Sequence, residues 1–134
     1  MPVECGWMVL CKQTIVDQEN NVTLVGCIEQ LQARVFPVTL GDWSLVALLY
    51  RSEVAHSARI PLRFVVEPPG RPRVVLADFS SEFQPSTRRN RVFFKLAGLQ
   101  LASPGSYVFV LETDGGRILA RLPLDVSAIS AQAG

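Results

Sequence analysis

The chain has 134 residues, of which 49% are hydrophobic and 19% are charged. This length suits one domain with a single buried core, and the apolar content excludes a disordered polar chain. Lys and Arg (13) nearly balance Asp and Glu (12), giving a formal charge of +1, so no overall field favours nucleic acid or an anionic membrane surface.

Short apolar runs separated by Gly, Pro or Asn recur along the chain, and no stretch shows sustained helical periodicity with a cap at its start. Strands are expected at residues 7–16, 22–28, 43–50, 59–67, 73–79, 91–96, 107–111 and 118–126. The Ala and Leu content of 43–50 leaves a short helix open there. The pattern predicts an all-β fold, an antiparallel two-sheet sandwich of about seven to eight strands, with a closed barrel as the alternative. One domain is expected over residues 1–126, followed by a short flexible tail at 127–134.

The strongest local signal is a hairpin at residues 104–126. Apolar residues alternate over 107–111 and again over 118–126, so each strand presents one apolar face. Between them Asp114-Gly115-Gly116 supplies residues that tolerate positive φ. These turn residues have a structural role and are therefore not candidates for a functional site.

A second hairpin is expected near the N-terminus, around the polar turn at residues 17–21. A turn centred near Glu19 places Cys11 roughly opposite Cys27. Gly26 inside the second strand indicates a bulge or a close backbone approach.

The middle of the chain carries three further expectations. Pro61 favours an edge position for its strand, because proline cannot donate to a ladder. The polar span at 80–90 is the longest expected loop, and its Phe83 is the only loop aromatic available to a ligand. Phe93 and Phe94 point to opposite faces of one strand, so at least one belongs to the core.

With these hairpins in place, the chain resembles an uncharacterised family of small bacterial β-sandwich proteins. The matching segments are Val22-Thr23-Leu24-Val25-Gly26, residues 62–70, Leu99-Gln100-Leu101, Pro104-Gly105-Ser106-Tyr107 and Asp114-Gly115. The resemblance implies an immunoglobulin-like or macroglobulin-like sandwich whose closing strand carries a core tyrosine, and it implies no catalytic residue. The chain departs from the commoner Asp-containing first strand by having Cys11-Lys12.

The three cysteines are expected to be reduced thiols, because their number is odd and the chain is large enough to fold without bridges. Zinc is not expected, since there is no Cys-x-x-Cys pair and no nearby histidine. At least two of Cys5, Cys11 and Cys27 are expected to be buried, with Cys5 as the one exposed. The N-terminus lacks a signal peptide pattern and no window is long enough for a membrane span, which predicts a cytoplasmic protein.

Catalytic chemistry finds little support in the sequence. His56 is the only histidine and has no Gly-x-Ser-x-Gly turn to supply a nucleophile. Asp78 and Glu82 lie near one expected loop, and a pocket that gathered them with His56 would indicate an enzyme. We therefore expect no enzyme, no cofactor and no metal.

One local concentration of charge remains as a weak candidate binding site. It consists of Arg71, Arg73, Arg88, Arg89 and Arg91. If the 80–90 loop folds near residues 71–73, these guanidinium groups could meet a phosphate backbone or an acidic partner. Arginines at solvated strand ends also block edge aggregation, and no aromatic stacking set accompanies them in the sequence.

The sequence therefore favours a non-catalytic sandwich that acts through protein contacts, with another protein or with itself. Nucleic-acid or anion binding by the arginine cluster is the first alternative, and a loop-built enzyme is the second. No membrane partner is expected.

Overall fold

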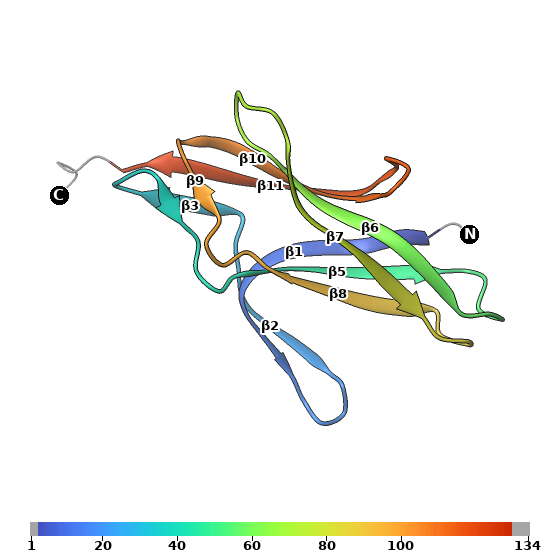
Figure 1. Ribbon diagram of the computed structural model, residues 1–134. Coiled ribbons are helices and arrows are strands. Elements are labelled where there is room, and N and C mark those ends of the chain that lie inside the picture. The colour runs from blue at the N-terminus through green and yellow to red at the C-terminus, as the bar shows by residue number, and fades with distance from the viewer. Residues whose placement is uncertain (1–2, 130–134) are drawn as a thin grey trace.

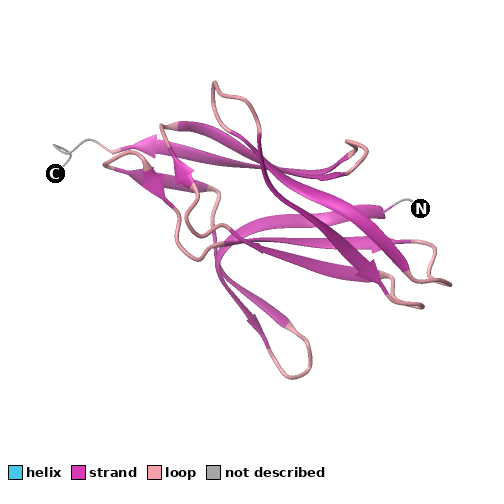
Figure 2. Ribbon diagram, viewed as in Figure 1, coloured by secondary structure: helices cyan, strands magenta, loops and turns pink. Residues whose placement is uncertain are grey.

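The computed structural model describes residues 3–129 and shows two β-sheets packed face to face (Figure 1). No helix is present among these residues (Figure 2), and so none is long and apolar enough to span a membrane. The strands are β1 (Val3–Val16), β2 (Val22–Cys27), β3 (Gln30–Ala33), β4 (Val38–Thr39), β5 (Ser44–Arg51), β6 (Ala58–Glu67), β7 (Val74–Phe83), β8 (Arg89–Lys95), β9 (Gln100–Leu101), β10 (Gly105–Thr113) and β11 (Ile118–Ala128). The all-β fold class is confirmed, and residues 44–51 form a strand rather than a helix.

The strands are ordered β2-β1-β5-β8 in a four-stranded sheet and β3-β11-β10-β6-β7 in a five-stranded sheet. A small third sheet pairs β4 with β9. Two separate large sheets make a sandwich and rule out the closed barrel. All strand pairs are antiparallel except β3 with β11, which is parallel.

The core lies between the inner faces of the two sheets, where alternate residues of each strand point inward. Phe64, Phe109 and Leu111 of the five-stranded sheet are fully buried, as are Leu10 and Leu45 of the four-stranded sheet. Phe94 of β8 stacks on Phe64 with ring centroids 5.5 Å apart, so one of the adjacent phenylalanines does belong to the core.

The expected core tyrosine is Tyr107, at the start of β10. It is 3% exposed, and its hydroxyl donates to the carbonyl oxygen of Ser103 at 2.6 Å. The same hydroxyl accepts from the Ser103 amide at 3.3 Å. A tyrosine that bonds the backbone a few residues upstream is the tyrosine corner of immunoglobulin-like sandwiches, so this feature supports the implied architecture.

Both end hairpins are confirmed. β10 and β11 pair along their length, and the Thr113 amide donates to the Arg117 carbonyl at 2.9 Å across the turn. In the N-terminal hairpin Cys11 lies opposite Cys27, as expected. β1 is long because its first part pairs with β5 and its last part with β2. The β1–β2 arm therefore extends away from the body of the sandwich (Figure 1).

Pro61 does not mark an edge strand, because β6 lies between β10 and β7. The pairing of β6 with β10 ends where Leu62 faces Thr113, and Pro61 lies beyond it, opposite Ser80 of β7. β6 has only one neighbour at that point, so the proline lies where β6 is itself an edge, beyond the part that pairs with β10.

The loop expected at 80–90 is shorter, because β7 continues to Phe83. Phe83 is 1% exposed and belongs to the core, so it is not available to a ligand. β7 is an edge strand with a solvated outer face, and its alternating polar residues therefore read as loop in the sequence. β11 likewise continues through Ala128, which faces Ala33 of β3, so the tail begins later than residue 127. Residues 130–134 lie outside the described part of the chain.

Arg51, one residue beyond the strand expected at 43–50, is the last residue of β5 and is 1% exposed. Its Nε donates to the Thr87 carbonyl at 2.9 Å and its Nη2 to the Gln84 carbonyl at 2.8 Å. The guanidinium lies 4.9 Å from the centroid of the Phe83 ring. Arg51 thus holds the β7–β8 connection and fixes where β8 begins.

Candidate binding site: a groove beside the N-terminal hairpin

The outer face of the four-stranded sheet carries a row of large side chains from three adjacent strands. Trp7 of β1 faces Leu48 of β5, and Leu48 in turn faces Arg91 of β8. In the next row Val46 of β5 faces Phe93 of β8. Residues opposite each other in a ladder share one face, so the aromatic and the cationic side chains lie side by side.

The aromatic rings of this face are accessible. Trp7 is 38% exposed and Phe93 is 43% exposed. Rings of this size usually lie in cores or at interfaces, because each carries a large apolar area. Two accessible rings on one sheet face therefore distinguish this face as a contact surface.

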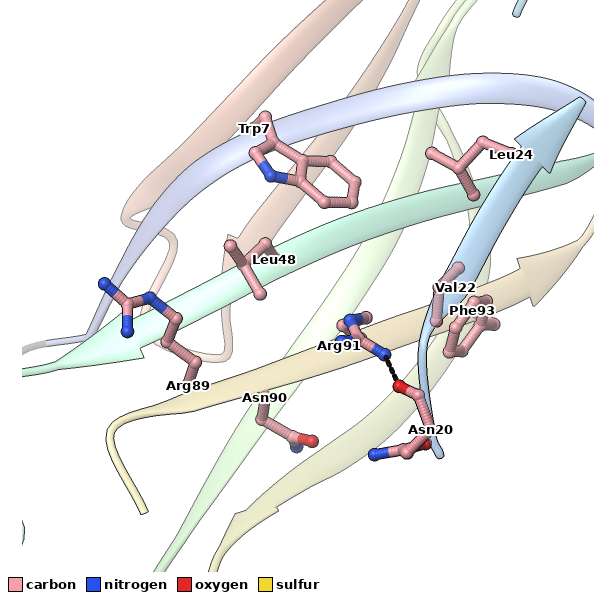
Figure 3. Close-up of a pocket in the computed structure, with 9 residues that line it drawn as sticks. All are labelled: Trp7, Asn20, Val22, Leu24, Leu48, Arg89, Asn90, Arg91 and Phe93. Atoms are coloured by element: carbon pink, nitrogen blue, oxygen red, sulfur yellow. Dashed lines mark hydrogen bonds between the residues drawn. The ribbon is translucent and has the colours of Figure 1, made fainter. Parts of the chain in front are cut away.

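The β1–β2 arm turns this face into a groove. Val22 and Leu24 of β2 form one wall, and the Asn20 carbonyl at the hairpin turn accepts a hydrogen bond from Arg91 Nη1 at 3.1 Å (Figure 3). We call this cavity of about 550 Å³ the hairpin groove. Its lining residues are Trp7, Asn20, Val22, Leu24, Leu48, Arg89, Asn90, Arg91 and Phe93.

The lining contains two arginines and no carboxylate. The arginine–carboxylate ion pairs among residues 3–129 involve Arg59, Arg63, Arg73, Arg117 and Arg121. Neither Arg89 nor Arg91 is among them. The groove therefore combines an apolar floor with two arginines that form no ion pair among the described residues.

The start of β8 is held in place by its neighbours. The Asn90 side chain donates from Nδ2 to Ser81 Oγ at 2.5 Å and to the Glu82 carbonyl at 3.2 Å, both on β7. The Arg51 amide donates to the Arg88 carbonyl at 2.9 Å. These bonds fix the backbone from which Arg89 and Arg91 project.

The hairpin turn is also ordered by its own side chain. Asp17 Oδ1 accepts from the amides of Asn21 and Glu19, each at 2.9 Å. The Asn21 amide, and then that of Glu19, hold the pKa of Asp17 below its ordinary value of 3.8. Because this carboxylate is used within the turn, Asn20 keeps a fixed position at the end of the groove.

The five arginines of the sequence-based cluster do not meet at one place. Arg71 and Arg73 precede β7, whereas Arg88, Arg89 and Arg91 follow it. The 10 residues of β7 lie between them, a separation of roughly 33 Å at about 3.3 Å per residue. Arg71 and Arg73 line a separate, proline-rich cavity of about 360 Å³, and Arg88 lines a third hollow with Glu4 and Tyr50.

Sequence reasoning missed the aromatic partners of Arg89 and Arg91. It found no stacking set because Trp7 is remote from β8 in sequence, while β5 brings the two strands side by side. The sequence did predict that Phe93 and Phe94 point to opposite faces of one strand. The strand order, which no local pattern specifies, was the missing information.

The groups that would have indicated an enzyme lie apart, each beside a different side chain. His56 Nδ1 is 3.9 Å from Glu53, Asp78 is 2.8 Å from Arg63, and Glu82 is 3.5 Å from Arg59. Among residues 3–129 no group of three His, Cys, Asp or Glu side chains could hold a metal ion.

The cysteines are arranged differently from the expectation. Cys11 is buried, Cys5 is half-buried and Cys27 is the exposed one. Burial raises the pKa of Cys5, whose thiol donates to the Trp7 carbonyl at 3.2 Å. Cys5 is thus only partly accessible and Cys27 is the exposed cysteine, so of the two or more buried cysteines that were expected only Cys11 is buried.

Residues 6–127 match the model of a family of unknown function, DUF6941. No curated protein sequence matches the chain.

Three solved structures align with the chain. A β-D-glucoside glucohydrolase from Trichoderma reesei aligns with a TM-score of 0.59 and 9% identity over 93% of this chain, but over only 19% of the enzyme. A β-glucosidase from Kluyveromyces marxianus aligns with a TM-score of 0.55 and 13% identity over 72% of this chain and 14% of the enzyme. An immunoglobulin-like protein from Pseudomonas aeruginosa aligns with a TM-score of 0.44 and 13% identity over 94% of this chain and 97% of that protein. The chain thus spans less than a fifth of either glucosidase, and the likeness shows the fold alone.

Proposed function

The chain belongs to DUF6941, a family of unknown function, and from the hairpin groove we propose that it is a non-catalytic domain that binds another protein. The observation that carries this proposal is the pair of accessible rings, Trp7 and Phe93, in a groove with ordered walls. Trp and Arg are enriched among residues that dominate binding energy at interfaces. A sandwich that fixes both its aromatic floor and its cationic side is suited to recognition.

A glycosidase function finds no support from the two glucosidase likenesses. Glycoside hydrolysis needs two carboxyl groups facing one another across a substrate. The hairpin groove has no carboxylate in its lining, and Asp78 and Glu82 are each paired with an arginine of β6. Binding therefore accounts for the groove better than catalysis does.

The proposal can be tested with a displayed library of random peptides panned on the immobilised protein. Enriched peptides are measured against the wild type, Trp7→Ala and Phe93→Ala. Ile118→Ala is the matched control, because Ile118 is exposed to a similar extent on the five-stranded sheet. We expect the groove variants to lose at least about tenfold in affinity, as central aromatic anchors do, and the control to be unchanged. Binding that survives both groove variants would overturn the proposal, as would a library with no enriched peptide.

Trp7 also supplies a direct signal for this test. The chain has two tryptophans, and the other, Trp43, is partly buried beside Lys12. In a Trp43→Phe background all tryptophan emission comes from the groove. A peptide that enters the groove should shift this emission to the blue, because it removes water from the ring.

Light scattering over a range of concentrations shows whether the partner is a second copy of the chain. A dimer that Phe93→Ala dissociates would identify the groove as a self-association surface. A monomer at all concentrations would indicate that the partner is a different protein.

A further inference from the structure

Resting on the proposed function, we propose that the hairpin groove binds an extended acidic segment of another protein. An apolar side chain of that segment lies against Trp7, Leu48 and Phe93. Its carboxylates contact Arg89 and Arg91.

The charge of the groove requires an acidic partner. A guanidinium group has five N–H donors, and Arg91 uses one of them on the Asn20 carbonyl. Arg89 takes part in none of the ion pairs made by arginines elsewhere in residues 3–129. Two guanidinium groups two residues apart, and therefore on the same face of β8, can each bind a carboxylate through paired hydrogen bonds.

The shape of the groove favours an extended chain. β8 is the last strand of its sheet, and the wall formed by β2 is apolar, with Val22 and Leu24. An extended peptide alternates its side chains between two directions. A segment that alternates acidic and apolar residues would therefore present one kind to the arginines and the other to the aromatic floor.

A nucleic-acid strand suits the groove less well than a peptide. Proteins that bind single strands combine stacking rings with a positive track that follows several phosphates. Here the positive stretch is short. Glu4 lies one strand beyond Tyr50, which faces Arg89, and Asp17 and Glu19 belong to the turn that ends the groove. A nucleic-acid strand that continued beyond the groove in either direction would bring its phosphates close to these carboxylates, which would repel them.

Three fluorescein-labelled probes test the inference by polarisation. The first is a peptide of about ten residues that alternates Glu or Asp with Leu and Phe, the second replaces each acid by its amide, and the third is an oligothymidylate of about ten nucleotides. We expect the acidic peptide to bind about tenfold or more tightly than its amide counterpart, with an affinity that falls as salt is added.

The variant Arg89→Gln/Arg91→Gln should remove the preference for the acidic probe. Arg34→Gln/Arg71→Gln is the matched control, because it removes the same charge from exposed positions outside the groove. In Arg89→Glu/Arg91→Glu the preference should reverse toward a Lys-containing peptide. Far-ultraviolet circular dichroism and a thermal melt verify that each variant is folded.

The outcomes separate this inference from the proposed function. Equal, groove-dependent binding of the acidic and amide peptides would overturn the acidic partner but leave a protein-binding groove. Tighter binding of the oligothymidylate, lost in Arg89→Gln/Arg91→Gln, would overturn it in favour of nucleic acid. No binding of the acidic peptide at up to about 1 mM would also overturn it.

Discussion

The outer faces of the two sheets both carry arginines and large apolar side chains, but they differ in whether the arginines are paired with carboxylates. On the five-stranded sheet, Arg73 of the β6–β7 connection reaches the Glu112 carboxylate on β10, and the Glu112 side chain is only 5% exposed. Val65 and Val110, which face each other on this sheet, are fully buried. On the four-stranded sheet Arg89 and Arg91 take part in none of the ion pairs within residues 3–129, and the rings of Trp7 and Phe93 are accessible.

What separates the two faces is the placement of carboxylates across the strands. Arg63 of β6 faces Asp78 of β7 at 2.8 Å, and Arg121 of β11 reaches Glu67 of β6 at 2.6 Å. The five-stranded face therefore pairs its own arginines with carboxylates and buries Val65 and Val110, whereas Val75, opposite Val65 on β7, is 47% exposed. The hairpin groove on the four-stranded face has cations and apolar groups but no carboxylate in its lining, which is the composition expected of a surface that another molecule completes.

The largest effect is expected from Arg73→Met on the five-stranded face. Removing one partner of a fully buried ion pair costs roughly 3–5 kcal/mol. Arg73 is about half exposed, so water moderates the loss, and we expect the free energy of unfolding to fall by about 2 kcal/mol. Urea denaturation followed by circular dichroism measures it.

The same substitution on the other face provides the control. Arg89→Met should change the free energy of unfolding by no more than about 0.5 kcal/mol, because no ion pair is lost. Adding Glu112→Gln to Arg73→Met should recover part of the stability, since the carboxylate left without its cation is then neutral. Equal losses from the arginine variants of both faces would show that the faces do not differ in this way.

The next effect concerns dye binding rather than stability. Anilinonaphthalene sulfonate is aromatic and anionic, so it should bind in the hairpin groove, and Phe93→Ala with Arg89→Gln should weaken it by about tenfold. Ile118→Ala with Arg121→Gln makes equivalent changes on the five-stranded face and should leave binding unaltered. If Ile118→Ala with Arg121→Gln weakened dye binding instead, the dye would be bound on the five-stranded sheet, and the prediction would be contradicted.

The sequence was sufficient to predict the sandwich and both hairpins, because those signals are local. Asp114-Gly115-Gly116 lies between two alternating runs, and the polar turn around Glu19 sets the register that places Cys11 opposite Cys27. The parallel pairing of β3 with β11 was not predictable in the same way. It joins segments from opposite ends of the chain, and no pattern within either segment specifies the other.

The groove was predicted only in part, for the same reason. Arg89 and Arg91 were candidates because residues 88–91 contain three arginines. Trp7 became their neighbour only through β5, which lies between β1 and β8. Arg51 gave no sign of its burial, because its hydrogen bonds go to backbone carbonyls of Gln84 and Thr87. Every residue has a backbone carbonyl, so the sequence does not indicate which ones a buried arginine will bond.

The smallest effect is expected at the hairpin turn, which supports the wall of the groove. The amides of Asn21 and Glu19 bond the Asp17 carboxylate and lower its pKa below 3.8. A lowered pKa in the folded state means that the ionised form stabilises the turn. This contribution is therefore present above pH 3.8 and is lost as the pH falls through the lower, folded-state pKa.

Amide chemical shifts of Glu19 and Asn21 measure this loss. Both should titrate together with a midpoint below 3.8, and Asp17→Asn should abolish the titration. Because the Asn20 carbonyl accepts from Arg91 at the end of the groove, the Arg91 side-chain signals should shift with the same midpoint. Arg91 signals that stay constant while the turn titrates would show that the arm and the four-stranded face are not coupled. The binding surface would then be formed by β1, β5 and β8 alone. The difference between the two outer faces would not depend on the hairpin.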